Sequence, residues 1–376
     1  MQNDFNLDPH LLYMNHAAVA PWPVRSVEAV KKFAEENGRV GSSHYLNWLE
    51  TEQTLKNDLA KLINAASADE IALLKNTSEG LSIIAKGIQW QAGDNIVISN
   101  EEFPSNFIVW DALRAQGVEL RIANISDTDY PEKAIIEQMD VNTRLLSISA
   151  VQYASGLRMN LALLGKACKS FKALYCVDAI QQIGAVQFDV QDMDADFVVA
   201  DGHKWMLGPE GLALFYCKKD SFDELQLQQF GWHMVEDLSD FSNMKNWQPA
   251  ANARRFECGS PNTMGIHALQ ASISLLLERG MHNIETGVLA NIQQLVTLFS
   301  QLSDINIISP TDISRHAGIF SFNKQGAESQ LLYQYLLSKG VVCALRGGGI
   351  RFSPHYYNQK SEFEKLAEWV DTYTEK

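Results

Sequence analysis

VVADGHKWMLGPEG, residues 198–211, decides the fold that this chain is expected to adopt. An apolar run ends here in a polar turn, in which Lys204 follows His203 and precedes Gly208 and Gly211. A lysine is rarely buried without a partner, but at a strand end inside a pocket its lowered pKa lets the amine form a Schiff base with a carbonyl. The residue types alone leave a surface lysine in a glycine-rich loop as an equal alternative.

Short apolar runs alternate with amphipathic helices on both sides of this stretch. The predicted strands are Ile71–Leu74, Asn95–Ser99, Val118–Ala123, Leu145–Ala150, Ala173–Val177, Phe197–Ala200 and Leu212–Tyr216. Helices are predicted between most of them, near 78–87, 104–116, 131–138 and 160–171. Continuous apolar runs that alternate with helices predict an α/β fold with a mostly parallel seven-stranded sheet, which binds ligands at its strand ends.

The rest of the chain suggests three parts. An N-terminal segment over 1–22 precedes a large domain over 23–262, which begins with two helices in 24–64 and includes a loop region over 220–258. Residues 263–376 bring connecting helices and then a β-β-α-β-β-α pattern. That pattern predicts a small C-terminal α+β domain.

Composition narrows the function classes. The chain has 376 residues and a net charge of −14, which disfavours binding to nucleic acid or to anionic membranes. Its five cysteines form no CxxC pair, so we expect free thiols in a reducing compartment and no metal site. The N-terminus has no basic start and no long apolar stretch. We therefore expect a cytoplasmic, soluble enzyme.

Three other segments follow predicted strands and contain side chains that could bind a ligand or take part in a reaction. Asp178 ends an apolar run and precedes Gln181, so it can either meet a cationic ligand, such as a protonated pyridine, or cap the next helix. Thr77 and Ser78 begin a helix, where backbone N–H groups and hydroxyls bind phosphate or simply form a cap.

The third segment is RGGGIRFSPHYYN, which starts at residue 346. Its guanidiniums can grip a carboxylate with paired hydrogen bonds, or lie on a solvated turn.

Together, and in this order, these segments resemble the class V aminotransferase family of fold-type I pyridoxal 5′-phosphate enzymes. That family includes cysteine desulfurases, isopenicillin N epimerase-like proteins and kynureninase. The most specific motifs are Val-Asp178-x-x-Gln181 and Gly-His203-Lys204, supported by Thr-Ser-Glu-Gly, Arg-Phe-Glu-x-Gly-Ser-Pro-Asn and Arg-Phe-Ser-Pro-His-x-Tyr-Asn. The similarity runs from Tyr13 to Asn358.

The resemblance implies roles for the residues around the cofactor, pyridoxal 5′-phosphate. Lys204 would hold it as a Schiff base and later move the Cα proton. Asp178 would pair with the pyridine nitrogen, and Gln181 would hydrogen-bond the 3′-oxygen. Thr77 and Ser78 would bind the phosphate.

The resemblance also implies outer contacts. His203 would assist at the phosphate, and Ser260 would reach a phosphate across a homodimer interface. The Phe103 side chain would stack on the pyridine ring. Arg351 would bind the α-carboxylate of a small amino-acid substrate, and Arg346 would line the same mouth.

Two departures from the family pattern affect the expected reaction. Cysteine desulfurases carry a nucleophilic cysteine between the segments that match Arg346 and Arg351, whereas this chain has only Gly-Gly-Gly-Ile there, and the neighbouring Cys343 lies in an apolar run that predicts a buried strand. Tyr153 stands where relatives often have Asn, so either Tyr153 or Gln152 would touch the cofactor from this side.

We expect an active site between domains and between subunits of a homodimer. An aminotransferase of small amino acids is the first choice. The alternatives are a C–S lyase or another β-eliminating or desulfurase-like enzyme, and then an amino-acid epimerase. A non-catalytic cofactor carrier is disfavoured by the intact lysine and arginines, and a nucleotide-binding protein by the lack of a GxGxxG motif after the first strand.

Overall fold

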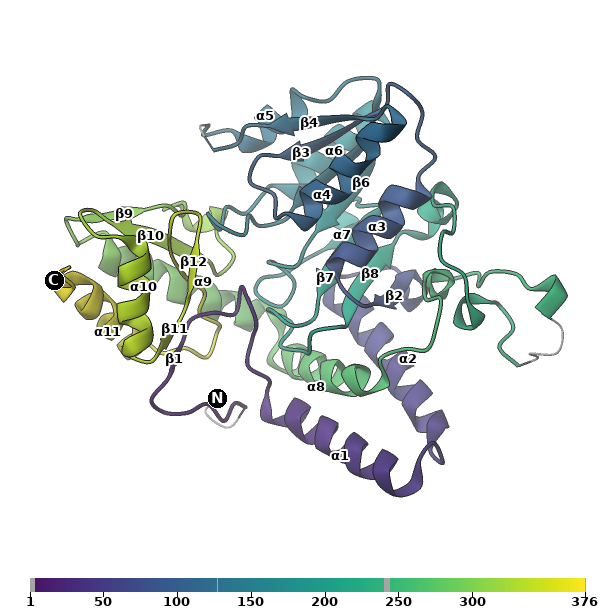
Figure 1. Ribbon diagram of the computed structural model, residues 1–376, viewed down its shortest axis with the longest axis horizontal. Coiled ribbons are helices and arrows are strands. Elements are labelled where there is room, and N and C mark those ends of the chain that lie inside the picture. Colours follow the sequence, from purple (N-terminus) through teal and green to yellow (C-terminus); the bar gives the residue numbers. More distant parts are fainter. Residues whose placement is uncertain (1–3, 127, 240–243, 376) are drawn as a thin grey trace.

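A seven-stranded sheet forms the centre of the large part of the molecule (Figure 1). The structure is a computed structural model that describes residues 4–126, 128–239 and 244–375. The strand order is β2-β8-β7-β6-β5-β3-β4. The bounds are β2 Ile71–Leu74, β3 Asn95–Ser99, β4 Glu119–Ala123, β5 Thr143–Ser149, β6 Leu174–Asp178, β7 Phe197–Asp201 and β8 Ala213–Cys217. Strand β8 runs opposite to the other six strands, which share one direction, so the predicted mostly parallel sheet is confirmed.

Helices cover both faces of this sheet, which explains its continuous apolar strands. In β6, Tyr175 and Val177 point into one core, and Leu174 and Cys176 point into the other. Helices α2, α6 and α8 contribute to the first core, and helices α3 and α4 to the second. The helices of this part are α1 Val24–Val40, α2 Tyr45–Leu62, α3 Thr77–Gly87, α4 Ser105–Asp111, α5 Pro131–Ile136, α6 Leu161–Phe171, α7 Val190–Met193 and α8 Thr263–Arg279.

A four-stranded antiparallel sheet, in the order β12-β13-β10-β9, forms the small part (Figure 1). It packs with α10 and α11 around a core of aromatic side chains that includes Phe299, Phe320, Phe322 and Phe352. The bounds are α9 Met281–Phe299, β9 Ile305–Ile307, β10 Phe320–Lys324, α10 Ser329–Ser338, β12 Ala344–Arg346, β13 Gly349–Phe352 and α11 Lys360–Thr372.

The N-terminal segment joins this small part. Strand β1, Leu12–Tyr13, pairs in parallel with β11, Val341–Val342, in a sheet of its own. The prediction of one strand over Val341–Ala344 is therefore wrong: the run divides at Cys343 because its first half pairs with β1 and its second half, β12, pairs with β13.

Helix α8 packs its buried face into the same core as α2 and the sheet, and α9 leads on to the small sheet. The division at residue 262 thus stays a prediction. In the ranges that the structure describes, no helix has both the length and the apolar character needed to cross a membrane.

Candidate active site

A cavity of about 530 Å³ opens where β5, β6 and β7 end, and arginines of the small sheet close its other side. Every site residue predicted from the sequence lines this cavity except Ser260. Since these residues come from segments far apart in the chain, their meeting is a result of the tertiary fold.

Lys204 lies three residues beyond β7, and the next residue fixes its backbone. Trp205 is fully buried and donates a hydrogen bond from Nε1 to Gln181 Oε1 at 2.9 Å. The Lys204 ammonium is 5.6 Å from the centre of the Phe103 ring. Burial lowers the pKa of Lys204 to about 8, and the nearby arginines act in the same direction. A larger fraction of its amine is therefore uncharged at neutral pH than in an ordinary lysine.

Asp178 is the last residue of β6 and is 2% exposed. Its Oδ1 accepts a hydrogen bond from the backbone N–H of Ile180 at 3.1 Å. Burial raises the pKa of this carboxyl to about 7, while the charge of Lys204 opposes that shift. A cation placed against Asp178 would keep it ionised.

The N-terminus of helix α3 forms a polar corner of the cavity. Asn76 caps the helix by accepting a hydrogen bond from the backbone N–H of Glu79 at 2.8 Å. Thr77 Oγ1 accepts from the backbone N–H of Asp201 at 3.1 Å, which ties α3 to β7. Close packing keeps this end in place, because a Cβ at Gly80 would lie 2.6 Å from a Val199 methyl group. Helix N-termini of this kind favour anions.

Ser78 and His203 complete the corner. Ser78 Oγ donates to Ser105 Oγ at 2.8 Å. His203 Nδ1 is buried and has no hydrogen-bond partner within the described ranges. Burial and the Lys204 charge lower the pKa of His203 to about 4, so its ring is neutral at pH 7. A neutral imidazole can still donate one hydrogen bond to an anion.

Phe103 and Tyr153 form the aromatic side of the cavity. Their ring centres are 5.2 Å apart and nearly perpendicular. The preceding residue, Glu102, anchors this segment, because its carboxylate accepts hydrogen bonds from the backbone and hydroxyl of Ser149 and from Asn106. Of the two residues that the sequence analysis proposed for this side, Tyr153 lines the cavity and Gln152 does not.

Arg351 is 2% exposed and comes from β13. Its Nη1 donates to the Tyr153 carbonyl at 2.7 Å, while Nε finds no partner in the described chain. Burial lowers the pKa of Arg351 to about 10, with Arg346 acting in the same direction. Arg346 is exposed, and a tight turn joins the two through Gly347 and Gly348, whose φ angles are +58° and +78°. A buried, underpaired guanidinium is suited to a carboxylate ligand.

The structure also brings in residues that the sequence analysis missed. Ala17 to Val19 of the N-terminal segment, Ser105 and Asp201 line the cavity. Asp201 lies inside the quoted stretch, three residues before Lys204, and its position directly after an apolar run was the available signal. Ser260 is exposed and instead lines a smaller hollow, of about 160 Å³, beside Gly211 and Asn262.

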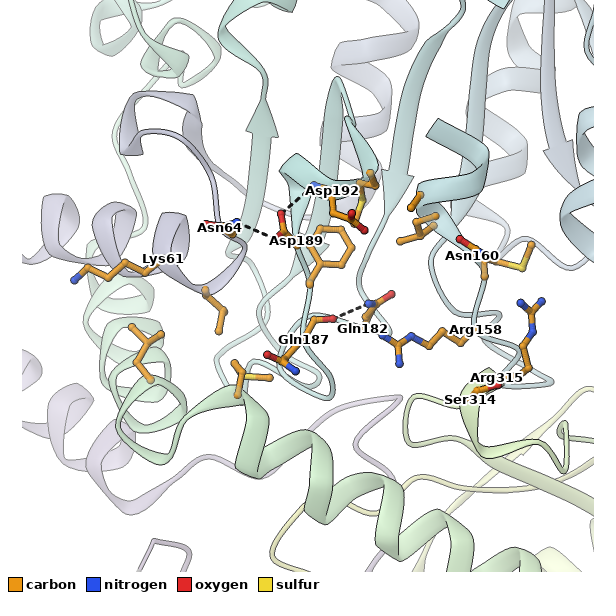
Figure 2. A pocket seen from close by; sticks show the side chains of 18 residues that line it. Lys61, Asn64, Arg158, Asn160, Gln182, Gln187, Asp189, Asp192, Ser314 and Arg315 are labelled. Carbon is orange, nitrogen blue, oxygen red and sulfur yellow. Dashed lines mark hydrogen bonds between the residues drawn. The ribbon is translucent and has the colours of Figure 1, made fainter. Parts of the chain in front are cut away.

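A second cavity of about 700 Å³ lies between the large part and the small part (Figure 2). Its two arginines are already paired: Arg158 with Glu285 at 3.4 Å and Arg315 with Glu132 at 2.9 Å. Lys61 at its edge is largely exposed and pairs with Asp58. The cavity is lined by no cysteine and by no lysine other than Lys61 among the residues described, so it offers no activated nucleophile.

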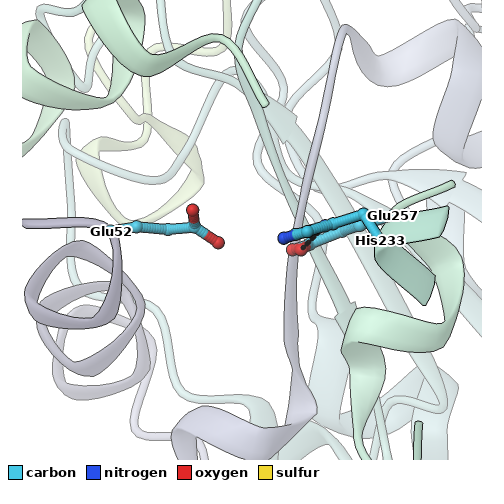
Figure 3. A group of neighbouring side chains, drawn as sticks. All are labelled: Glu52, His233 and Glu257. Carbon is cyan, nitrogen blue, oxygen red and sulfur yellow. Dashed lines mark ion pairs between the residues drawn. The ribbon is translucent and has the colours of Figure 1, made fainter. Parts of the chain in front are cut away.

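Glu52, His233 and Glu257 form a buried group whose ligand atoms lie within 4.8 Å of one another (Figure 3). The Lys56 ammonium forms ion pairs with both carboxylates of this group, at 3.0 Å from Glu52 and 2.8 Å from Glu257, and so supplies the positive charge that a metal ion would bring. Glu257 also accepts a hydrogen bond from the backbone of Leu73 at 2.7 Å. The cluster is therefore an internal ion-pair network that holds α2 against β2.

All five cysteines are described, all are free, and none lines the 530 Å³ cavity. Cys343 is 3% exposed, and burial raises its pKa to about 12. Cys258 is partly exposed, and its thiol contacts Gln229. The cavity thus has no thiolate of its own.

Comparisons with known proteins point to one family. The sequence model of the family described as "Aminotransferase class-V" matches residues 12–366. A "Probable cysteine desulfurase" of Methanothermobacter thermautotrophicus is 31% identical over 382 residues, covering 96% of this chain and 94% of the relative.

Two solved structures share the fold. The apo cysteine desulfurase of Thermococcus onnurineus has a TM-score of 0.85 at 24% identity and covers 96% of this chain and 94% of its own. The cystine C–S lyase C-DES, solved with its product cysteine persulfide, has a TM-score of 0.88 at 20% identity, with 96% and 97% covered.

Proposed function

Since the chain belongs to the class V aminotransferase family of pyridoxal-phosphate-dependent enzymes, we propose that it cleaves the C–S bond of a sulfur-containing amino acid by β-elimination. Cysteine and cystine are the proposed substrates. The sulfur would leave in a small-molecule product, without transfer to a cysteine of the protein. One observation carries this choice: a cavity with an activated lysine and two arginines, but no thiol.

The residues present fit the cofactor. The α3 N-terminus offers a cradle for an anion. His203, whose Nδ1 has no hydrogen-bond partner in the described chain, lines the same cavity. Asp178 offers a buried carboxylate for a pyridinium, and the amine of Lys204 lies over the ring of Phe103. These features match the phosphate, the ring nitrogen, the aldehyde and the ring face of pyridoxal phosphate. When bound, it supplies an electron sink for the electrons released at Cα.

The chain's own residues would then position the substrate and move its protons. Arg351 binds the α-carboxylate through its underpaired guanidinium. The Lys204 amine, with its pKa of about 8, takes the proton from Cα and can return it later. Phe103 and Tyr153, whose rings meet edge to face, would cover one face of the bound cofactor.

The balance of the reaction needs no redox partner. Cysteine and one water give pyruvate, ammonia and hydrogen sulfide: the Cα–H and Cβ–S bonds break, and sulfur leaves with the electron pair. Cystine gives pyruvate, ammonia and thiocysteine in the same way. The relative at 31% identity is named a desulfurase, which supports a sulfur amino acid as substrate. Since no cysteine lines the cavity, release of the sulfur in a small molecule is favoured over its transfer to a cysteine of the protein.

Transamination of a small amino acid, our first expectation from the sequence, is the second candidate. The observation that favours it is the pair Arg346 and Arg351 at one cavity wall, because two guanidiniums can grip both carboxylates of a dicarboxylic acid. Epimerisation requires only that Lys204 return the Cα proton from the other face or through a second group.

One experiment separates these reactions. Purified protein loaded with pyridoxal phosphate is incubated with cysteine, cystine or alanine, with and without 2-oxoglutarate. Pyruvate, ammonia, sulfide and the chirality of the recovered amino acid are then measured. We expect pyruvate and ammonia in equal amounts from cysteine or cystine without an oxo acid. Pyruvate formed from alanine only in the presence of 2-oxoglutarate would favour transamination, and recovery of the opposite enantiomer would favour epimerisation.

The proposal also includes a homodimeric assembly and a cytoplasmic location for the protein. Ser260 is exposed and lies outside the cavity of its own chain, which supports a homodimer in which it reaches the partner's phosphate. The five free cysteines support a cytoplasmic location. The net charge of −14 supports a small-molecule substrate over a nucleic acid.

A further inference from the structure

Asp201 is a carboxylic acid in the cavity that the sequence analysis did not predict. It ends β7, is 9% exposed and lines the cavity. Its backbone N–H donates to Thr77 Oγ1 at 3.1 Å, so the residue is held against the first turn of α3. Its side-chain Oδ1 is buried and has no hydrogen-bond partner among the described residues. A buried polar atom without a partner points to a ligand that is still to be accounted for.

The position of Asp201 creates a conflict of charge. Helix α3 begins beside it with the Asn76 cap and the hydroxyl of Ser78, and the unpartnered Nδ1 of His203 lies in the same cavity. This is the corner that we assign to the phosphate. An ionised carboxylate and a phosphate dianion in one corner repel each other, whereas a protonated carboxyl can donate a hydrogen bond to the phosphate.

The charges around Asp201 do not remove the conflict. Burial raises the pKa of Asp201 to about 6, and Glu210 adds to the shift, while the hydrogen bonds from Thr77 and the charge of Lys204 oppose it. The titratable and charged groups in or beside the cavity come from several elements. They are Lys204, His203 and Glu210 on the following loop, Asp178 on β6, Tyr153 after β5, Glu79 with its partner Lys75 at α3, and Arg346 and Arg351 on the small sheet. Of these, the charge of Lys204 acts on Asp178 as well as on Asp201.

We propose that Asp201 is a contact of the cofactor's phosphate that works in its protonated form, so that binding of the phosphate ester takes up one proton. The inference rests on the cofactor site of the proposed function and deepens it. Cofactor retention would then depend on pH through a residue that performs no step of the reaction.

The sign of the effect follows from linkage. A phosphate monoester loses its second proton near pH 6, and the free Asp201 carboxyl titrates at about 6. Above that pH both partners are ionised before they meet, and the complex retains one proton between them. The affinity therefore falls as pH rises, by up to about tenfold per pH unit, until the bound proton is also lost.

The test measures proton uptake by calorimetry. The apo-protein is titrated at pH 7.5 with pyridoxal phosphate in two buffers that differ in ionisation enthalpy, and the difference in heat gives the number of protons bound. The same titration with pyridoxal, which lacks the phosphate, is the internal control, because any protons that belong to Lys204 and Asp178 are common to both ligands. We expect about one proton more for pyridoxal phosphate than for pyridoxal.

Variants localise that proton. In Asp201→Asn the excess proton should disappear. Between pH 6.5 and 8.5 the dissociation constants of pyridoxal phosphate and pyridoxal should then change with pH in parallel, because the protons of Lys204 and Asp178 are common to both ligands. Asp201→Ser serves if the asparagine variant does not fold. Equal proton uptake for the two ligands in the wild-type chain would overturn the inference, as would an excess that persists in the variants. Failure of the wild-type chain to bind either ligand would refute the cofactor site itself, which is a different outcome.

Discussion

Replacing Arg351 with methionine tests how the cavity recognises the α-carboxylate of its substrate. Arg351 is buried, donates one hydrogen bond to the Tyr153 carbonyl, and has an Nε without a partner in the described chain. Methionine keeps an unbranched apolar side chain of similar reach and removes the charge. A lost charge-assisted contact is worth about 1.5–3 kcal/mol, which corresponds to roughly a 10- to 150-fold lower kcat/KM for cysteine.

The assay compares two substrates so that a general loss of activity is not mistaken for lost recognition. Cysteamine is cysteine without its carboxylate. In the wild-type enzyme kcat/KM is expected to be far higher for cysteine than for cysteamine, and in Arg351→Met that ratio should fall by the same 10- to 150-fold. The matched control is Arg158→Met, because Arg158 lines the other cavity and should leave the ratio unchanged.

A stability measurement sharpens the same prediction. Since burial lowers the pKa of Arg351 to about 10, its charge is unfavourable in the folded protein without a ligand. Arg351→Met should therefore unfold at the same temperature as the wild-type apo-protein or higher. An unchanged ratio of the two substrates in the folded variant would refute the assignment of Arg351 to the carboxylate.

Four further outcomes are expected. Cys343→Ser should keep most activity, and mass spectrometry after cysteine treatment should show no +32 Da adduct on the wild-type thiol, since Cys343 is buried; such an adduct would restore the desulfurase alternative. Asp178→Asn should lower turnover roughly 100-fold or more, because a buried charge pair that loses one partner costs about 3–5 kcal/mol; near-normal pyruvate release would contradict its role. Lys56→Met should lower the free energy of unfolding by about 3–5 kcal/mol in urea titrations, because two buried carboxylates lose their shared cation; a loss below 1 kcal/mol would argue against the network. Mixing inactive Lys204→Ala with Ser260→Trp should restore some activity through hybrid dimers, and a fully active monomer in sedimentation would exclude shared sites.

The sequence by itself determined the local elements, and it singled out Lys204 as the residue to which we assign the chemistry. All seven strands of the large sheet were predicted to within one or two residues, because a strand buried on both faces is a continuous apolar run and needs no knowledge of its neighbours. The division of Val341–Ala344 escaped this reasoning, because it depends on the pairing of β1, a segment more than 300 residues away.

Only the tertiary structure decided which side chains face the cavity. Spacing along the chain placed Lys204 and Asp178 at strand ends, but it could not tell Tyr153 from Gln152, nor show that Ser260 lies outside its own cavity. These outcomes depend on how distant segments pack. The same holds for Asp201. The sequence shows that an aspartate stands at this position, but only the fold buries it beside α3 and leaves its Oδ1 without a hydrogen-bond partner in the described chain. Burial and pairing are properties of the assembled fold, since they arise from contacts that no local pattern encodes.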